Sequence, residues 1–147
     1  MTQVHIPAGA LVLVVDGKRA RFLRNRGNPL HVELISERVL EQENPPTREQ
    51  GTDRPGRYLG PDGVSRSAVE QTDWHQLAEE RFAAQIAERL YHMAHAHAFD
   101  KMVVVAAPKT LGVLRASFHR EVATRVVAEV AKDLTWLPEL EIAKRLS

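Results

Sequence analysis

A continuous apolar run, Met102-Val-Val-Val-Ala-Ala107, lies between Lys101 and Pro108. The run shows no alternation of apolar and polar residues, which is typical of a strand buried on both faces of a sheet. Proline has no amide proton to donate to a neighbouring strand, so Pro108 marks the end of the run. We therefore expect this run to be a central strand of an α/β domain.

The N-terminal region predicts an antiparallel meander. A β-branched run from Ala10 to Val15 is followed by Asp16-Gly17, a dipeptide that strongly favours a hairpin turn. We expect a second strand from Lys18 to Asn25 and a third from about Leu30 to Leu40. Adjacent strands joined by short turns pair most simply as antiparallel neighbours.

Helices are expected in three places. Apolar residues recur at helical spacing from Asp73 to about His97, and Thr110 can cap a short helix after the apolar run. Pro138 is suited to the first position of a last helix that continues to Leu146. The segment from Glu121 to Asp133 fits both a helix and a strand, and periodicity leaves the two alternatives open.

Between about Glu41 and Thr72 the periodicity disappears, and prolines and glycines are frequent. We expect a long loop at about 41–72. Ordered domains seldom contain a loop of this length unless it is functional or mobile. Both alternatives, a functional loop and a mobile insertion, stay open at this point.

Composition limits the class of protein. A chain of 147 residues has the usual size of one domain, and the absence of cysteine excludes disulfides, thiolate metal sites and cysteine nucleophiles. A net charge of +1 argues against a protein that coats nucleic acid by charge alone. The apolar runs are too short to span a bilayer, and the first residues lack the pattern of a signal peptide. We therefore expect a cytoplasmic protein that does not bind membranes.

Motifs for catalysis are incomplete. The three histidines His92, His95 and His97 cannot converge on one metal ion from an intact helix, although His92 and His95 form a possible pair of ligands. No Gly-x-Ser-x-Gly elbow supports a serine triad, and the common glycine-rich nucleotide-binding motifs are absent. We expect no metal, no cofactor and no catalytic residues, and we favour a protein that is not an enzyme while leaving an enzyme open as the alternative.

Two basic groups are candidates for binding an anion. Lys18, Arg19 and Arg21 lie on the expected second strand, where Arg19 and Arg21 share a face that suits phosphate. The alternative is an edge strand that charge protects from aggregation. In the loop, Arg54 and Arg57 flank a turn that also contains Asp53 and Gly56, and they can bind an anion if the loop is ordered.

Several motifs together resemble those of the bacterial host attachment protein family, named for proteins required for attachment to host cells. The fold of that family is similar to the middle domain of archaeal and eukaryotic class I peptide-release factors. The resemblance implies a strand at about Arg125 to Asp133, and it places the long loop where release factors carry their catalytic Gly-Gly-Gln. This chain has Glu49-Gln50-Gly51 there, so the resemblance does not imply peptidyl-tRNA hydrolysis. The motifs are Val14-Val-Asp-Gly-Lys-Arg-Ala-Arg21, Asn44-Pro45, Asp53-Arg-Pro-Gly-Arg57, His75, Arg81-Phe82-Ala83, Phe99-Asp100, Ala107-Pro108, Leu111-Gly-Val-Leu-Arg115 and Lys132-Asp-Leu-Thr135.

The sequence therefore predicts a single domain over 1–147 with a mixed five-stranded sheet, similar to the release-factor middle domain. Two alternative functions are open, and we favour the first. The first is a non-catalytic intracellular module that binds RNA or the ribosome through Lys18, Arg19, Arg21, Arg54 and Arg57. The second is a small hydrolase or ligand-binding enzyme whose site gathers Asp16, Asp53, Arg57 and His75.

Overall fold

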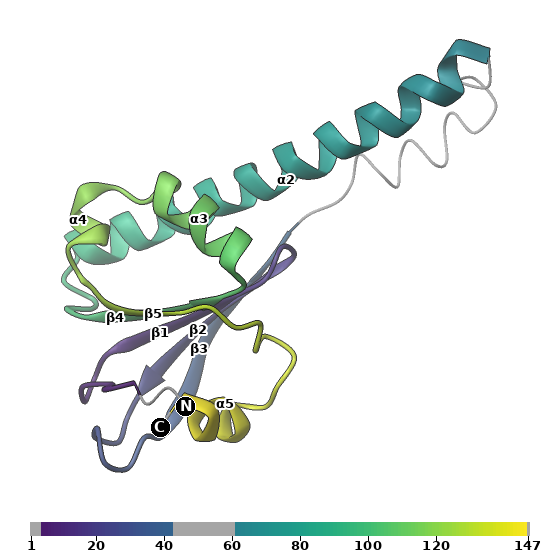
Figure 1. The fold of residues 1–147 in the computed structure, drawn as a ribbon. Helices are drawn as coiled ribbons and strands as arrows, with labels where there is room; N and C mark the ends of the chain where they lie inside the picture. The colour runs from purple at the N-terminus through teal and green to yellow at the C-terminus, as the bar shows by residue number, and fades with distance from the viewer. Residues whose placement is uncertain (1–3, 43–60, 147) are drawn as a thin grey trace.

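The computed structural model describes residues 4–42 and 61–146, and the side chains of 4–42 and 76–146. The chain forms a single α/β domain (Figure 1). Its elements in order are β1 (Leu11–Val15), β2 (Arg19–Asn25), β3 (Leu34–Glu41), α2 (Pro61–His95), β4 (Met102–Ala106), α3 (Pro108–Ser117), α4 (Arg120–Ala123), β5 (Val126–Val130) and α5 (Glu139–Leu146).

The sheet has five strands in the order β3-β2-β1-β4-β5. Strands β1, β2 and β3 pair as antiparallel neighbours, which confirms the predicted meander. Strands β1, β4 and β5 are parallel to one another. The prediction of a mixed five-stranded sheet is confirmed.

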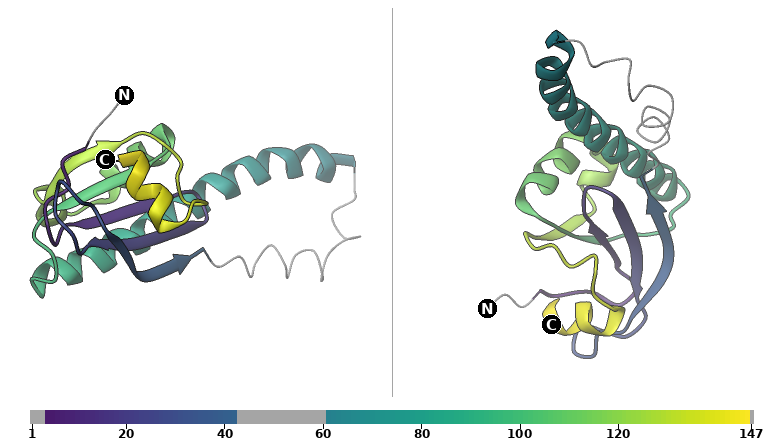
Figure 2. Two further views of the ribbon diagram at one scale, coloured as in Figure 1. Left: turned by 90° about the horizontal axis from the view of Figure 1, so that it is seen from below. Right: turned by 90° about the vertical axis from the view of Figure 1, so that its right-hand side faces the viewer.

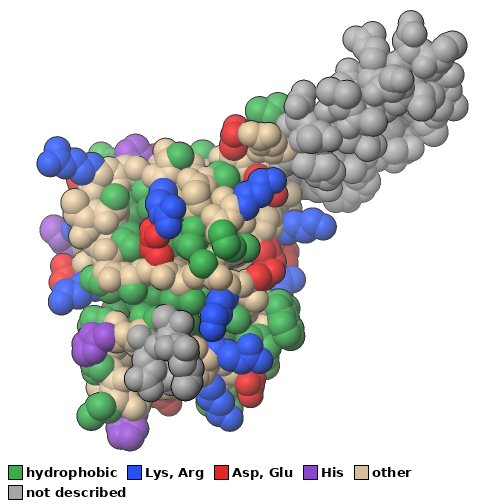
Figure 3. Space-filling model, in the orientation of Figure 1, with side chains coloured by type: hydrophobic (Ala, Val, Ile, Leu, Met, Phe, Trp, Pro, Cys, Tyr) green, Lys and Arg blue, Asp and Glu red, His purple; other side chains and the backbone are tan. Residues whose placement is uncertain are grey.

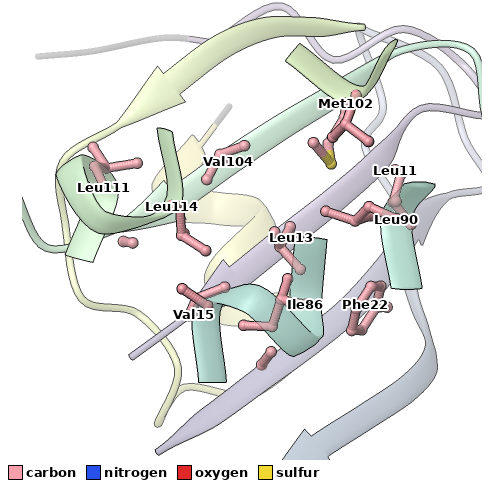
Figure 4. Close-up of a cluster of buried hydrophobic side chains, with 14 of the residues drawn as sticks. Leu11, Leu13, Val15, Phe22, Ile86, Leu90, Met102, Val104, Leu111 and Leu114 are labelled. Atoms are coloured by element: carbon pink, nitrogen blue, oxygen red, sulfur yellow. The ribbon is translucent and has the colours of Figure 1, made fainter. Parts of the chain in front are cut away.

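Two apolar clusters cover the two faces of the sheet. Helices α2, α3 and α4 lie on one face, and α5 lies on the other (Figures 1 and 2). Figure 4 shows the first cluster, in which Leu11, Leu13 and Val15 of β1 meet Ile86 and Leu90 of α2. The alternate residues of β1 and β4 belong to the second cluster. All residues of β4 are fully buried between β1 and β5, which confirms the predicted central strand.

Helix α2 begins at Pro61, so the prediction of a loop extending to Thr72 and a helix starting at Asp73 was wrong. Prolines in this region were taken to exclude a helix. The amide of the first helical residue has no partner within the helix, so a proline at that position loses no hydrogen bond. Gly63 costs about 1 kcal/mol relative to alanine, and a helix tolerates a single glycine of this kind. Residues 43–60 of the predicted loop lie outside the described part of the chain.

The structure also defines the elements that follow β4. Pro108 is the first residue of α3, with Ala107 at the N-cap, so the prediction that Thr110 caps this helix was wrong. The segment with two alternatives contains a short helix, α4, followed by strand β5. Helix α5 starts one residue after Pro138 and buries Ile142, Ala143 and Leu146 against the sheet.

The C-terminus of α2 shows a Schellman motif. The amide of Ala98 donates to the carbonyl of Met93 at 2.8 Å, and the amide of His97 donates to that of Ala94 at 3.0 Å. His97 occupies the left-handed position of this motif with φ of 55°, and its side chain is exposed. The helix therefore ends at His95, two residues before the predicted end.

Because the left-handed region favours glycine, we predict that His97→Gly raises the free energy of unfolding by about 0.5–1 kcal/mol. The matched control is His95→Gly, which places glycine inside the last helical turn and lowers stability by about 1 kcal/mol. Urea unfolding monitored by circular dichroism measures both changes. A destabilised His97→Gly variant would contradict this account of the helix end.

Candidate functional site

The carboxyl ends of β1, β4 and β5 meet at one edge of the sheet. Val15 pairs with Ala106, and Val105 pairs with Val130, so the residues that follow these strands lie along the same edge. Ligands of α/β proteins usually bind at this edge. The β1–β2 hairpin lies here, and Gln42, which follows β3, is fixed here as well. Its backbone amide donates to the carbonyl of Lys18 at 2.7 Å, and its side chain donates to that of Ala78 at 2.9 Å.

Asp16 links the hairpin to the segment that follows β5. Its Oδ1 atom accepts hydrogen bonds from the backbone amides of Lys18 and Arg19, both at 2.7 Å. Its Oδ2 atom lies 2.7 Å from the hydroxyl of Thr135, which is also 2.9 Å from Oδ1 of Asp133. A hydroxyl carries one proton, so Thr135 donates to one carboxylate at a time. Asp16 therefore stabilises the turn and holds Thr135 against it.

Arg21 makes the second link. Its side chain is almost fully buried, with 9% of the residue exposed. Atom Nη1 donates to the carbonyls of Thr135, at 3.0 Å, and of Leu137, and Nη2 lies 3.1 Å from Oε1 of Glu139. The buried cation is thus satisfied by two backbone carbonyls and one carboxylate, which fixes the segment 135–139 against β2.

The other predicted basic residues differ from Arg21. Lys18 and Arg19 are exposed at the hairpin, and Arg19 lies 3.6 Å from Glu41 with both side chains largely in solvent. Arg54, Arg57, Asp53 and Gly56 lie outside the described residues. His75 is in α2, and its side chain is not among those described. Of the four residues proposed for a hydrolase site, the structure describes the side chain of Asp16 alone.

A small hollow lies beside the hairpin, between α2 and α3. Its lining is mostly apolar and includes Val15, Asp16, Phe82 and Val113, with Glu79 at one side. The space measures about 10 Å³, enough for roughly one water molecule.

The histidines near the end of α2 contact carboxylates. His92 lies 3.2 Å from Glu88, and His95 lies 3.2 Å from Glu121. Tyr91 packs against His95 and His119 in the same region, with ring centroids at 4.5 and 4.2 Å. Among the side chains that the structure describes, those of residues 4–42 and 76–146, no group of three or more histidine or acidic residues is placed to hold a metal ion.

The motif containing Arg115 also has a structural role. The guanidinium of Arg115 on α3 contacts the carboxylate of Glu129 on β5, with Nε at 2.9 Å and Nη2 at 2.6 Å from Oε1. This hydrogen bonding, together with the negative charge of Glu129, raises the pKa of Arg115 above its ordinary value. The pair ties the exposed edge strand β5 to helix α3.

Sequence reasoning missed the partners of Asp16 and Arg21. Thr135 and Asp133 belong to the motif Lys132-Asp-Leu-Thr135, which contributed to the family resemblance but was assigned no role. Nothing in the local sequence indicates that the carbonyls of residues 135 and 137 accept hydrogen bonds from Arg21. The structure joins these distant motifs through hydrogen bonds.

The sheet order, the hairpin and the long helix define an α/β domain of the release-factor middle-domain type. Residues 9–146 match the family described as bacterial archaeo-eukaryotic release factor family 12, and the chain belongs to this family. The match extends from before β1 to the end of α5, and it confirms the release-factor resemblance of the motifs. No curated protein matches the chain. Among the described helices, none is both long and apolar enough to cross a membrane.

We predict that Arg21→Ala lowers the free energy of unfolding by about 2–3 kcal/mol, because it leaves two buried carbonyls and Glu139 without their partner. Arg19→Ala is the matched control: it removes the same charge from the same strand at an exposed site and changes stability by about 0.5 kcal/mol or less. Urea unfolding of the two variants checks the difference. Equal losses in both would show that Arg21 does not hold the C-terminal segment.

Proposed function

We propose that this protein is a non-catalytic intracellular module that binds the ribosome through RNA. The observation that carries the proposal is the family match over nearly the whole chain, because release factors act on the ribosome. Similarity of fold alone supports a class of partner and not a reaction. An effect on attachment of bacteria to host cells would then be indirect.

The described side chains support a binding role over a catalytic one. Asp16 and Arg21, the charged residues best placed at the sheet edge, are engaged in holding chain segments together. The hollow beside Asp16 has room for about one water molecule. The sequence Glu49-Gln50-Gly51 also differs from the Gly-Gly-Gln that release factors use for hydrolysis.

Because the net charge is only +1, local groups of basic side chains must attract the phosphates of the RNA. Figure 3 shows basic and acidic side chains interspersed on one face of the molecule, in agreement with a net charge of +1. We assign phosphate contacts to Lys18, Arg19, Arg54 and Arg57. Arg21 supports this edge from within, and we assign Asp53, Gly56 and His75 the role of ordering the segment that carries the two loop arginines.

Sedimentation of the purified protein with ribosomes on sucrose gradients tests the proposal. We expect co-sedimentation at about 50 mM salt that weakens strongly by about 200 mM, because phosphate contacts release counterions. The double variant Arg54→Ala/Arg57→Ala is expected to bind about tenfold more weakly at low salt.

The matched control is Lys101→Ala/Arg120→Ala, which removes two positive charges at the other end of the sheet, where both residues are exposed. We expect this control to bind like the unmodified protein. Absence of co-sedimentation at low salt, or equal losses in the two double variants, would contradict the proposal.

A further inference from the structure

Trp136 is unusually exposed for its size. The residue is 70% exposed, whereas its neighbours Thr135 and Leu137 are 2% and 8% exposed. Tryptophan normally buries most of its ring, and exposed tryptophans are enriched at sites of recognition. The indole therefore lies in solvent on a turn whose adjacent residues are held inside the protein.

The backbone on both sides of Trp136 is fixed by the links described above. Arg21 donates to the carbonyls of Thr135 and Leu137, the residues before and after the tryptophan. The hydroxyl of Thr135 is held by Asp16, and the amide of Leu137 donates to the carbonyl of Leu134 at 3.1 Å. A rigid aromatic residue loses little conformational entropy when it binds, so this turn is pre-organised for an interaction.

Two lysines that can contact phosphates are exposed near the turn. Lys132 is exposed four residues before Trp136, and Lys18 is exposed in the turn that Asp16 stabilises. Glu139 is paired with Arg21, and the charges of Asp16 and Asp133, which both contact the hydroxyl of Thr135, are balanced by those of Lys18 and Lys132. An exposed aromatic ring with lysines near it can bind single-stranded nucleic acid, with bases stacking on the ring and phosphates contacting the cations.

We propose that Trp136 stacks on an unpaired RNA base, and that Lys18 and Lys132 contact the phosphates of the adjoining nucleotides. This inference rests on the proposed function, since it names the part of the RNA that the module binds, an unpaired base with its adjoining phosphates. The base must be unpaired, because bases within a duplex stack on one another and offer no free face. Leu140 is also exposed, at 67%, and a protein partner with an apolar pocket would use it together with Trp136.

The chain has two tryptophans, Trp74 and Trp136, so Trp74→Phe leaves Trp136 as the only indole fluorophore. Titration of this variant with a single-stranded RNA of about ten nucleotides is expected to quench the indole fluorescence. Anisotropy of the same RNA carrying a fluorescent label then compares affinities. We expect Trp136→Ala to bind about 5- to 100-fold more weakly and Trp136→Phe, which keeps a stacking face, to retain most of the affinity.

Leu140→Ala is the matched control, because it removes a neighbouring exposed apolar side chain that cannot stack on a base. Unchanged RNA affinity in this variant supports the inference. If Trp136→Ala binds RNA as tightly as the unmodified protein while the protein still co-sediments with ribosomes, the inference is overturned and the proposed function stands. Ribosome binding that is lost equally in Trp136→Ala and Leu140→Ala, with no affinity for the RNA, indicates a protein partner and overturns the inference. An unmodified protein that binds neither ribosomes nor RNA overturns both proposals.

Discussion

The buried guanidinium of Arg21 is the constraint on which the placement of the segment after β5 depends. A buried cation is costly unless its donors are satisfied, and here its partners lie at Thr135, Leu137 and Glu139. The chain must therefore return from β5 to β2, across the carboxyl edge of β1. Helix α5 begins at Glu139 and buries Ile142 and Leu146 on the face of the sheet that α2 leaves uncovered. One ionic residue thus helps to determine how the second apolar cluster is closed.

The same edge joins motifs that are far apart in the sequence. Asp16, from the hairpin, and Thr135, from the segment after β5, share a hydrogen bond at 2.7 Å across 119 residues. Arg115 and Glu129 tie α3 to β5 in a similar way. Asp16, Thr135 and Arg115 belong to the motifs that carry the family resemblance, and all three join segments of the domain. The turn that Asp16 and Arg21 fix carries the exposed Trp136.

The sheet could be predicted from the sequence because apolar runs and turn residues mark its strands directly. The run from Met102 to Ala107 contains no polar residue, so a strand formed by it must be covered on both faces. The start of α2 was missed because Pro61 is compatible with a loop and with the first turn of a helix, and local sequence does not distinguish them. The role of Arg21 was missed for a different reason. Two of its partners are backbone carbonyls, which every residue has, so no side-chain pattern in the sequence identifies them.

A double-mutant cycle between Asp16→Ala and Thr135→Val, measured as free energies of unfolding in urea, tests most directly whether the hairpin and the C-terminal segment stabilise each other. A hydrogen bond from a buried hydroxyl to a carboxylate predicts a coupling energy of about 1–2 kcal/mol between the two positions. The cycle separates this pair from the other hydrogen bonds that Asp16 makes within its own turn. Effects that add to within about 0.3 kcal/mol would contradict the account, because they would show that the hydrogen bond between Asp16 and Thr135 does not couple the hairpin to the C-terminal segment.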